Sequence, residues 1–260
     1  YSEWAPLPRD EIILPQLLRQ AGYVTQLIVD TYNMMSMGYD RGFDGWWWNR
    51  GQEADRYMTA PRKVVIPCDL NKVRLGEAFF TQYLRNVSLR RFEQDYFVAQ
   101  TMTAAAKWLE LNHDQHDKFF LHIDTFDPHE PWDPPKYYVD MYDPNYEGEI
   151  VNSPKYGPCE YLTPKELNHC RALYAGEATL VDRCVGILLK KIEDLGLLRN
   201  TAVIFTSDHG YYFGEHGLIG KFYETPPGSL ALYEEVAHIP VIIYLPDAEG
   251  GRRRRELVQP

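Results

Sequence analysis

The sequence predicts an α/β fold with a largely parallel sheet flanked by helices. Short, apolar, β-rich segments alternate along the chain with longer segments of helical periodicity. This alternation is typical of parallel sheets, because the connection between two parallel strands usually contains a helix. The chain has 260 residues, of which 45% are hydrophobic, so it can bury a substantial core, and we expect residues 1–260 to form a single domain.

The first helix and strand are expected near the start of the chain. Asp10 can cap a helix through 11–22, where Pro15 falls in the first turns and Gly22 ends the helix. The segment 23–29, YVTQLIV, predicts a buried strand because it is short and apolar. The helical residues expected to face inward are Ile13, Leu17, Leu18 and Ala21.

The next hundred residues are less regular. Residues 30–90 are rich in glycine, tryptophan and charge, and they predict surface loops. The loop tryptophans Trp46, Trp47 and Trp48 could stack on a sugar ring or pack on the rim of the sheet. Residues 92–111 predict a helix whose inward positions are Phe97, Ala105 and Leu109.

Three more strands and a long helix complete the pattern. The strand at 118–126 is followed by DPHEPWDPP, whose prolines exclude both a helix interior and a central strand. A helix over 164–195 has apolar residues at three- and four-residue steps, and Gly196 is expected to end it. The last strands are expected at 201–207 and 239–245.

The composition argues against several kinds of partner and site. The formal net charge is -10, so a general nucleic-acid-binding surface is not expected, because phosphate contacts need basic residues. No apolar run approaches the length of a membrane span. The four cysteines contain no Cys-x-x-Cys pair, which argues against a structural zinc site, although Cys159 and Cys170 could pair in an exported protein.

Polar residues follow three of the predicted strands, namely Asp30, His129 and the pair Asp208–His209. In open α/β sheets, ligands bind outside the carboxyl ends of the strands. We therefore expect these residues to share one rim of the sheet.

The segment FTSDHGYYFGEHGLIGK, residues 205–221, contains most of the candidate chemistry. Asp208 and His209 can face one cation where the chain leaves the strand, and Gly210 allows a sharp turn; the alternative is a turn capped by Asp208. Lys221 offers three donors to a tetrahedral anion, although a lone lysine is usually solvated. A structural role is expected for two further polar residues, Glu215 and His216, and the alternative is that they orient the metal or the lysine.

His129 is the candidate on the proline-rich loop. Pro128 and Pro131 restrict the loop, and Trp132 can shield the imidazole from water. The ring could then hold an anionic oxygen or protonate a leaving group, or it could simply pack on the tryptophan. Two neighbouring carboxylates could be either functional or solvated: Asp127 and Glu130.

The stretch YAGEATLVDRCVGILLKKIEDLGLLRNTAVIFTSDHGYYFGEHGLIGK closely resembles the type I sulfatase family of the alkaline-phosphatase-like superfamily. LYEEVAHIPVIIYLP continues the resemblance, and FLHIDTFDPHEPW is similar to the family's substrate-loop histidine segment. The resemblance runs from about Ile13 to Pro260 and is most specific at 201–221. It implies an alkaline-phosphatase-like fold and hydrolysis of a small-molecule or carbohydrate sulfate ester.

The resemblance implies roles for four residues. Asp208 and His209 would bind a divalent metal, which is calcium in most family members, while manganese or zinc would also suit a histidine ligand. Lys221 would hold the sulfate and assist the leaving oxygen, and His129 would contact the sulfate or the ester oxygen. Metal and lysine would neutralise the charge on the sulfate while a covalent nucleophile attacks sulfur.

Two departures from the family pattern stand out. The family's nucleophile is a formylglycine made from Cys or Ser in a Cys-x-Pro-x-Arg segment, which this chain does not contain. We expect that segment, with a first strand and its metal ligands, upstream of Tyr1. The domain is then incomplete at both ends, and these 260 residues alone should be inactive. Many members also have Gly-Lys-Trp-His where this chain has VDTYNM, so that lysine and histidine cannot be assigned here, and Asp30 or Asn33 would be only weak substitutes.

Two other functions fit the same residues. Sulfate and phosphate esters share tetrahedral anion geometry, so a phosphate or phosphonate ester hydrolase of the same superfamily is an alternative. The departures described above would also fit a sulfatase-like binding protein without catalysis.

Overall fold

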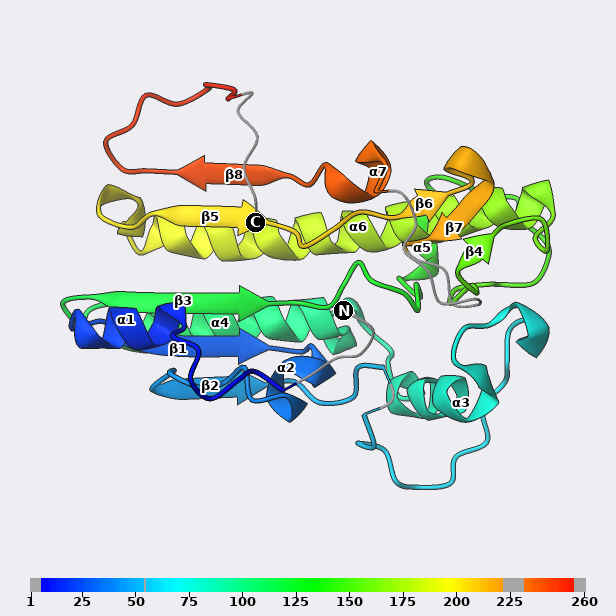
Figure 1. Ribbon diagram of the computed structural model, residues 1–260, viewed down its shortest axis with the longest axis horizontal. Helices are drawn as coiled ribbons and strands as arrows, with labels where there is room; N and C mark the ends of the chain where they lie inside the picture. Colours follow the sequence, from blue (N-terminus) through cyan, green and yellow to red (C-terminus); the bar gives the residue numbers. More distant parts are fainter. Residues whose placement is uncertain (1–5, 54, 222–231, 255–260) are drawn as a thin grey trace.

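The computed structural model of the protein describes three stretches of the chain, residues 6–53, 55–221 and 232–254. Within these stretches, parallel strands form a sheet in the order β2–β1–β3 (Figure 1). Its strands are β1 (Val24–Val29), β2 (Gly45–Trp48) and β3 (Phe119–Asp124). The central strand is the most buried, as its apolar run predicts: Leu27, Ile28 and Val29 are at most 1% exposed. This confirms the predicted parallel sheet.

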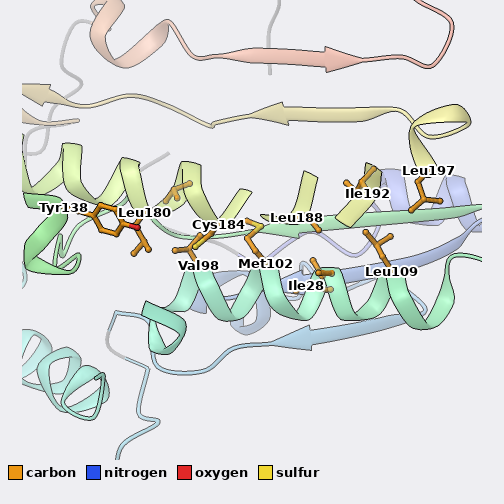
Figure 2. Packing of buried hydrophobic residues seen from close by; sticks show 13 residues of the cluster. Ile28, Val98, Met102, Leu109, Tyr138, Leu180, Cys184, Leu188, Ile192 and Leu197 are labelled. Carbon is orange, nitrogen blue, oxygen red and sulfur yellow. The ribbon is translucent and has the colours of Figure 1, made fainter. Parts of the chain in front are cut away.

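Two helices build the main core beside this sheet. They are α4 (Phe97–Asn112) and α6 (Pro164–Asp194), whose side chains interdigitate in Figure 2 together with Ile28 of β1. The three predicted inward residues of α4 are all buried: Phe97, Ala105 and Leu109. Removing one of the large side chains of this cluster, for example by Leu180→Ala, should cost about 2–5 kcal/mol because a cavity forms.

Local signals determine both ends of α6. The Thr163 hydroxyl accepts the N–H of Glu166 (3.2 Å), and the Glu166 carboxylate accepts the N–H of Thr163 (2.8 Å), so that each side chain satisfies a backbone donor of the first turn. At the other end, Gly196 adopts a left-handed conformation with φ of 67°. The helix therefore stops where the glycine predicts.

The last two strands do not join the parallel sheet. In the described residues, β5 (Val203–Thr206) pairs antiparallel with β8 (Val241–Tyr244), and Figure 1 shows α6 between this pair and the main sheet. Both strands lie within the predicted segments. The prediction that they join the parallel sheet is wrong, because in the described residues they pair only with each other. Apolar side chains on both strands are exposed, including Ile204 (65%) and Ile242 (64%).

A small antiparallel sheet contains the residues that lead to Lys221, at the end of the segment 205–221. Its order is β4–β7–β6, from β4 (Gly157–Pro158), β6 (Tyr212–Phe213) and β7 (Leu218–Gly220), as far as the described chain shows. Lys221 follows β7 directly. The position of this lysine is thus determined by pairing with a loop about 60 residues earlier in sequence, not by the main sheet.

Regular structure also occurs where loops were expected. Between residues 30 and 90 the structure contains α2 (Tyr32–Ser36), β2 and α3 (Gly76–Val87). The strand β2 was missed because its four residues, GWWW, form an edge strand whose Trp46 and Trp47 are 54% and 57% exposed. The other helices are α1 (Leu14–Gln20), α5 (Lys136–Val139) and α7 (Glu234–Ala237), with 3-10 turns η1 (Leu70–Lys72), η2 (Glu93–Asp95), η3 (Leu197–Arg199) and η4 (Glu215–Gly217).

Helix α1 differs from its prediction in detail. Its N-cap is Ile13, whose N–H is accepted by the Gln16 side chain (3.3 Å), and Asp10 does not cap it. Pro15 does lie in the first turn. Leu17 is 50% exposed, so the expected inward face is only partly buried.

Two further expectations concern cysteines and membranes. Each of the four cysteines is a free thiol, and the buried Cys170 donates to the carbonyl of Val151 (3.2 Å), so no disulfide joins it to Cys159. Among the helices of the described stretches, none combines the length and apolar character needed to cross a bilayer.

Candidate active site

The amine of Lys221 lies between two histidine rings. Its Nζ is 2.7 Å from Nε2 of His129 and 2.9 Å from Nε2 of His209. His129 follows β3 and His209 follows β5, and the arrowheads of these strands point the same way in Figure 1. Three of the four predicted site residues therefore meet, although they come from separate parts of the chain.

Backbone carbonyls determine which nitrogen of each ring carries the proton. Nδ1 of His129 is 2.7 Å from the carbonyl of Glu130, and Nδ1 of His209 is 2.8 Å from the carbonyl of Gly210. A carbonyl can only accept, so each Nδ1 donates, and in a neutral ring Nε2 is left as an acceptor. Both acceptors face Lys221, whose N–H groups donate to them.

Burial favours the neutral form of His129. It lowers the pKa of the ring to about 4, while the nearby Glu130 carboxylate acts in the opposite direction. The ring stacks on Phe126 with a centroid distance of 4.0 Å. Burial also lowers the pKa of Lys221, again opposed mainly by Glu130.

The loop that presents His129 is held from both sides. Trp132 is fully buried, and its indole N–H donates to the carbonyl of Pro128 (3.0 Å). The backbone N–H of His129 donates to the carbonyl of Phe126 (2.9 Å), and Phe126 in turn donates its N–H to Asp30 (2.6 Å). The tryptophan therefore anchors the loop, and the ring stacked on the His129 imidazole is Phe126, not Trp132.

Asp30 holds the loop that contains His129 through a hydrogen bond from the backbone of Phe126. It lies directly after β1, as expected, but it is fully buried and its carboxylate faces inward. Besides the N–H of Phe126, it accepts the hydroxyls of Thr101 (2.6 Å) and Thr125 (2.9 Å). Burial raises the pKa of Asp30 to about 8, the Asp127 carboxylate adds to this, and the three donors oppose it.

Asn33 does not replace the family's histidine in this arrangement. It lies in α2, where its carbonyl accepts the N–H of Met37 (3.0 Å). In the described part of the chain, no hydrogen bond joins its side chain to Lys221 or to either histidine.

The two expected metal ligands lie side by side. The Asp208 carboxylate accepts the N–H of His209 (2.9 Å), and its other oxygen is 3.4 Å from Nε2 of His209. The Asp208 side chain is 83% exposed, so its oxygens are accessible. The residues described here contain no group of three His, Cys, Asp or Glu side chains that could hold a metal. Asp208 can therefore supply oxygen ligands as the structure stands, whereas His209 can supply Nε2 only in place of its hydrogen bond from Lys221.

Two glycines allow the chain to pack closely around the site. A Cβ on Gly210 would lie 2.0 Å from the carbonyl oxygen of Glu235, so close packing on α7 is what requires glycine here, instead of the expected sharp turn. At Gly220, φ is 103°, and a Cβ would lie 2.5 Å from the Tyr156 ring. Gly220 precedes Lys221, so this packing positions the lysine.

Glu215 and His216 have the structural role expected of them. The Glu215 carboxylate accepts the N–H of Phe213 (2.6 Å), and the His216 ring stacks on Tyr233 at 3.7 Å.

The contacts of the Glu130 carboxylate beside the site were not predicted from the sequence. The Glu130 carboxylate accepts hydrogen bonds from Arg74 (3.1 Å) and from the hydroxyl of Tyr156. The guanidinium of Arg74 also lies 4.4 Å from the centre of the Tyr156 ring. Arg74 is 56 positions from Glu130, and nothing in its local sequence signals the contact.

The whole chain, residues 1–260, matches the family model described as Sulfatase. The chain belongs to the sulfatase family. This match confirms the resemblance and agrees with the α/β fold described above.

Known proteins similar to this sulfatase chain include enzymes for several esters. An arylsulfatase of Clostridium perfringens is 32% identical over 145 residues, which cover 49% of this chain and 28% of the arylsulfatase. An N-acetylglucosamine-6-O-sulfatase of Bacteroides thetaiotaomicron is 37% identical over 75 residues, covering 29% of this chain and 12% of that protein. The chain therefore spans less than a third of the length of either curated relative.

A solved structure shares the fold. The phosphonate monoester hydrolase of Agrobacterium radiobacter matches with a TM-score of 0.64 at 17% identity. The match covers 94% of this chain and 54% of that one.

Proposed function

We propose that the full-length protein is a sulfuric ester hydrolase. The observation that carries this proposal is the position of the Lys221 amine between His129 and His209. An ammonium group held by two neutral rings offers a fixed positive charge to a tetrahedral anion. Membership of the sulfatase family supports sulfate as that anion.

Lys221 and His129 are the proposed catalytic and substrate-binding residues. Two of the three N–H groups of Lys221 point to the imidazoles, and the third can donate to a sulfate oxygen. The same charge would stabilise the negative charge that develops on the leaving oxygen. His129 fixes the direction of the ammonium, and its proposed contact with the sulfate or the ester oxygen would be made by Nε2 when the lysine turns to the substrate.

A divalent metal is proposed at Asp208 and His209. The exposed Asp208 carboxylate suits such an ion, whereas His209 would bind it through Nε2 in place of the hydrogen bond from Lys221, which His129 would still hold. The family resemblance favours calcium, and manganese or zinc are alternatives that accept nitrogen ligands well. When bound, the metal would supply further positive charge to the sulfate oxygens. The other ligands and the formylglycine nucleophile are proposed to lie outside the described residues.

The proposed substrate is a small-molecule or carbohydrate sulfate ester. The supporting observation is that one relative is named for a sugar sulfate, N-acetylglucosamine 6-O-sulfate. Phosphate and phosphonate esters are the second candidate, because a tetrahedral anion of either kind fits a lysine held in this way.

The test compares an aryl sulfate with the matching aryl phosphate, using the full-length protein and its His209→Ala variant. We expect faster turnover of the sulfate, with both activity and bound metal lost in His209→Ala. Faster turnover of the phosphate would favour the second candidate. Sulfate binding without hydrolysis of either ester would indicate a binding protein. Unchanged turnover and metal content in His209→Ala would contradict the site assignment.

A further inference from the structure

One buried carboxylate beside the site has no part in the proposed function. Glu130 is 1% exposed, and its Oε1 accepts hydrogen bonds from Arg74 (3.1 Å) and from the Tyr156 hydroxyl. Its Oε2 is buried and has no hydrogen-bond partner among the described residues. An unpaired carboxylate oxygen in the interior is costly unless positive charge lies nearby.

The unpaired oxygen lies on the far side of the His129 ring from Lys221. Oε2 is 3.3 Å from Nδ1 of His129, whose N–H points to the backbone carbonyl of Glu130 (2.7 Å). The ring therefore has Glu130 on its Nδ1 side and the ammonium on its Nε2 side.

We propose that Glu130 is a positioning residue of this site. Its carboxylate, held by Arg74 and Tyr156, packs against the Nδ1 side of His129 and keeps the ring in the orientation that directs Nε2 at Lys221. Glu130 acts through His129 and does not touch the substrate. The inference rests on the proposed sulfate ester hydrolysis.

This role has a consequence that a merely structural role does not share. The carboxylate repels a bound sulfate, because both are negative and the site is buried. Removing its charge should therefore strengthen sulfate binding while it slows turnover. A purely structural carboxylate would, when removed, loosen the pocket and weaken both.

The experiment measures kcat for an aryl sulfate and the inhibition constant of inorganic sulfate, both with the full-length protein. For Glu130→Gln we expect kcat to fall about 10- to 100-fold, because the catalytic groups are no longer held in position. We expect the inhibition constant to fall roughly three- to tenfold, because a nearby like charge is gone. Glu166→Gln is the matched control: Glu166 is also buried and paired with a cation, Lys72 (2.5 Å). It should lower thermal stability only.

Two more variants keep the test decisive if Glu130→Gln folds poorly. Tyr156→Phe keeps the Glu130 charge but removes one of its holding bonds, so kcat should fall while the inhibition constant of sulfate stays unchanged. Glu130→Asp should behave in the same way, because it shortens the side chain without removing the charge. If all three variants keep the wild-type kcat, or if Glu130→Gln weakens sulfate binding, the inference is wrong. If Lys221→Ala also keeps the wild-type activity, the proposed function itself has failed.

Discussion

The Lys221 amine lies 2.7 Å from Nε2 of His129, a residue 92 positions earlier in the chain. The imidazole accepts this hydrogen bond because its other nitrogen donates to a backbone carbonyl, that of Glu130. The neutral ring therefore directs the lysine, and both the backbone carbonyl and the carboxylate of Glu130 lie on its Nδ1 side. This relationship leads to the first prediction.

Replacing His129 should release the lysine. We expect His129→Ala to lower kcat/KM for an aryl sulfate about 100-fold, because a positioned proton-transfer or orienting group contributes on that order. His113→Ala is a control, since His113 lies at the end of α4 and bonds only the Leu109 carbonyl among the described groups. Equal losses in the two variants would show that the effect is not specific to the site.

Removing Asp208 should remove the metal. Its side chain is 83% exposed and contacts His209, so it has the freedom to bind an ion without breaking the fold. We expect Asp208→Ala to lower bound metal at least about tenfold by elemental analysis, since a proposed ligand of the ion is lost.

Chelation should abolish activity and calcium should restore it. If only manganese or zinc restores activity, the proposed metal is that ion and not calcium. The exposed Asp182 on α6 gives the control, and Asp182→Ala should keep its metal.

Gly220 should tolerate no side chain. A Cβ there meets the Tyr156 ring at 2.5 Å, and the φ of 103° is unfavourable for other residues. We expect Gly220→Ala to lower the free energy of unfolding by about 2–3 kcal/mol and to displace Lys221, reducing kcat. A Cβ at Gly186 in α6 would meet no atom within 4 Å, so Gly186→Ala should be neutral or stabilise by up to about 1 kcal/mol. Urea denaturation gives the free energy of unfolding of both variants, and equal values for the two would contradict the prediction.

Asp30 should make stability depend on pH. Its folded pKa is raised to about 8, above the value near 4 of an unfolded aspartate. Between these values the folded protein binds more protons than the unfolded chain, so this group lowers the free energy of unfolding as pH rises from about 4 to about 8. Asp30→Asn removes that contribution. We expect the wild type to lose more stability than Asp30→Asn between about pH 5 and pH 8 in urea titrations. Parallel losses would contradict this role.

The helices of the core could be predicted from sequence because their signals are local. Phe97, Ala105 and Leu109 recur on one face of α4, and Gly196 ends α6 where expected. The partner of a strand is not a local property. The pairing of β5 with β8 therefore could not be predicted from segments that only identify each as a strand.

The candidate site could be predicted where one short segment or a family pattern carries it. His129, His209 and Lys221 were named from sequence, and the structure brings their side chains together. The contact of Arg74 with Glu130 could not be predicted, because it depends on how a loop before α3 folds back on the site.

The most direct test of the proposed function is kcat/KM for an aryl sulfate in the full-length protein and its Lys221→Ala variant. If Lys221 binds the sulfate and stabilises the leaving oxygen, the variant should lose about 100- to 1,000-fold in kcat/KM with its thermal stability nearly unchanged. Inorganic sulfate should then no longer inhibit it at wild-type concentrations. A variant that keeps the wild-type kcat/KM would contradict the central claim that this lysine, held between His129 and His209, is the anion-binding group.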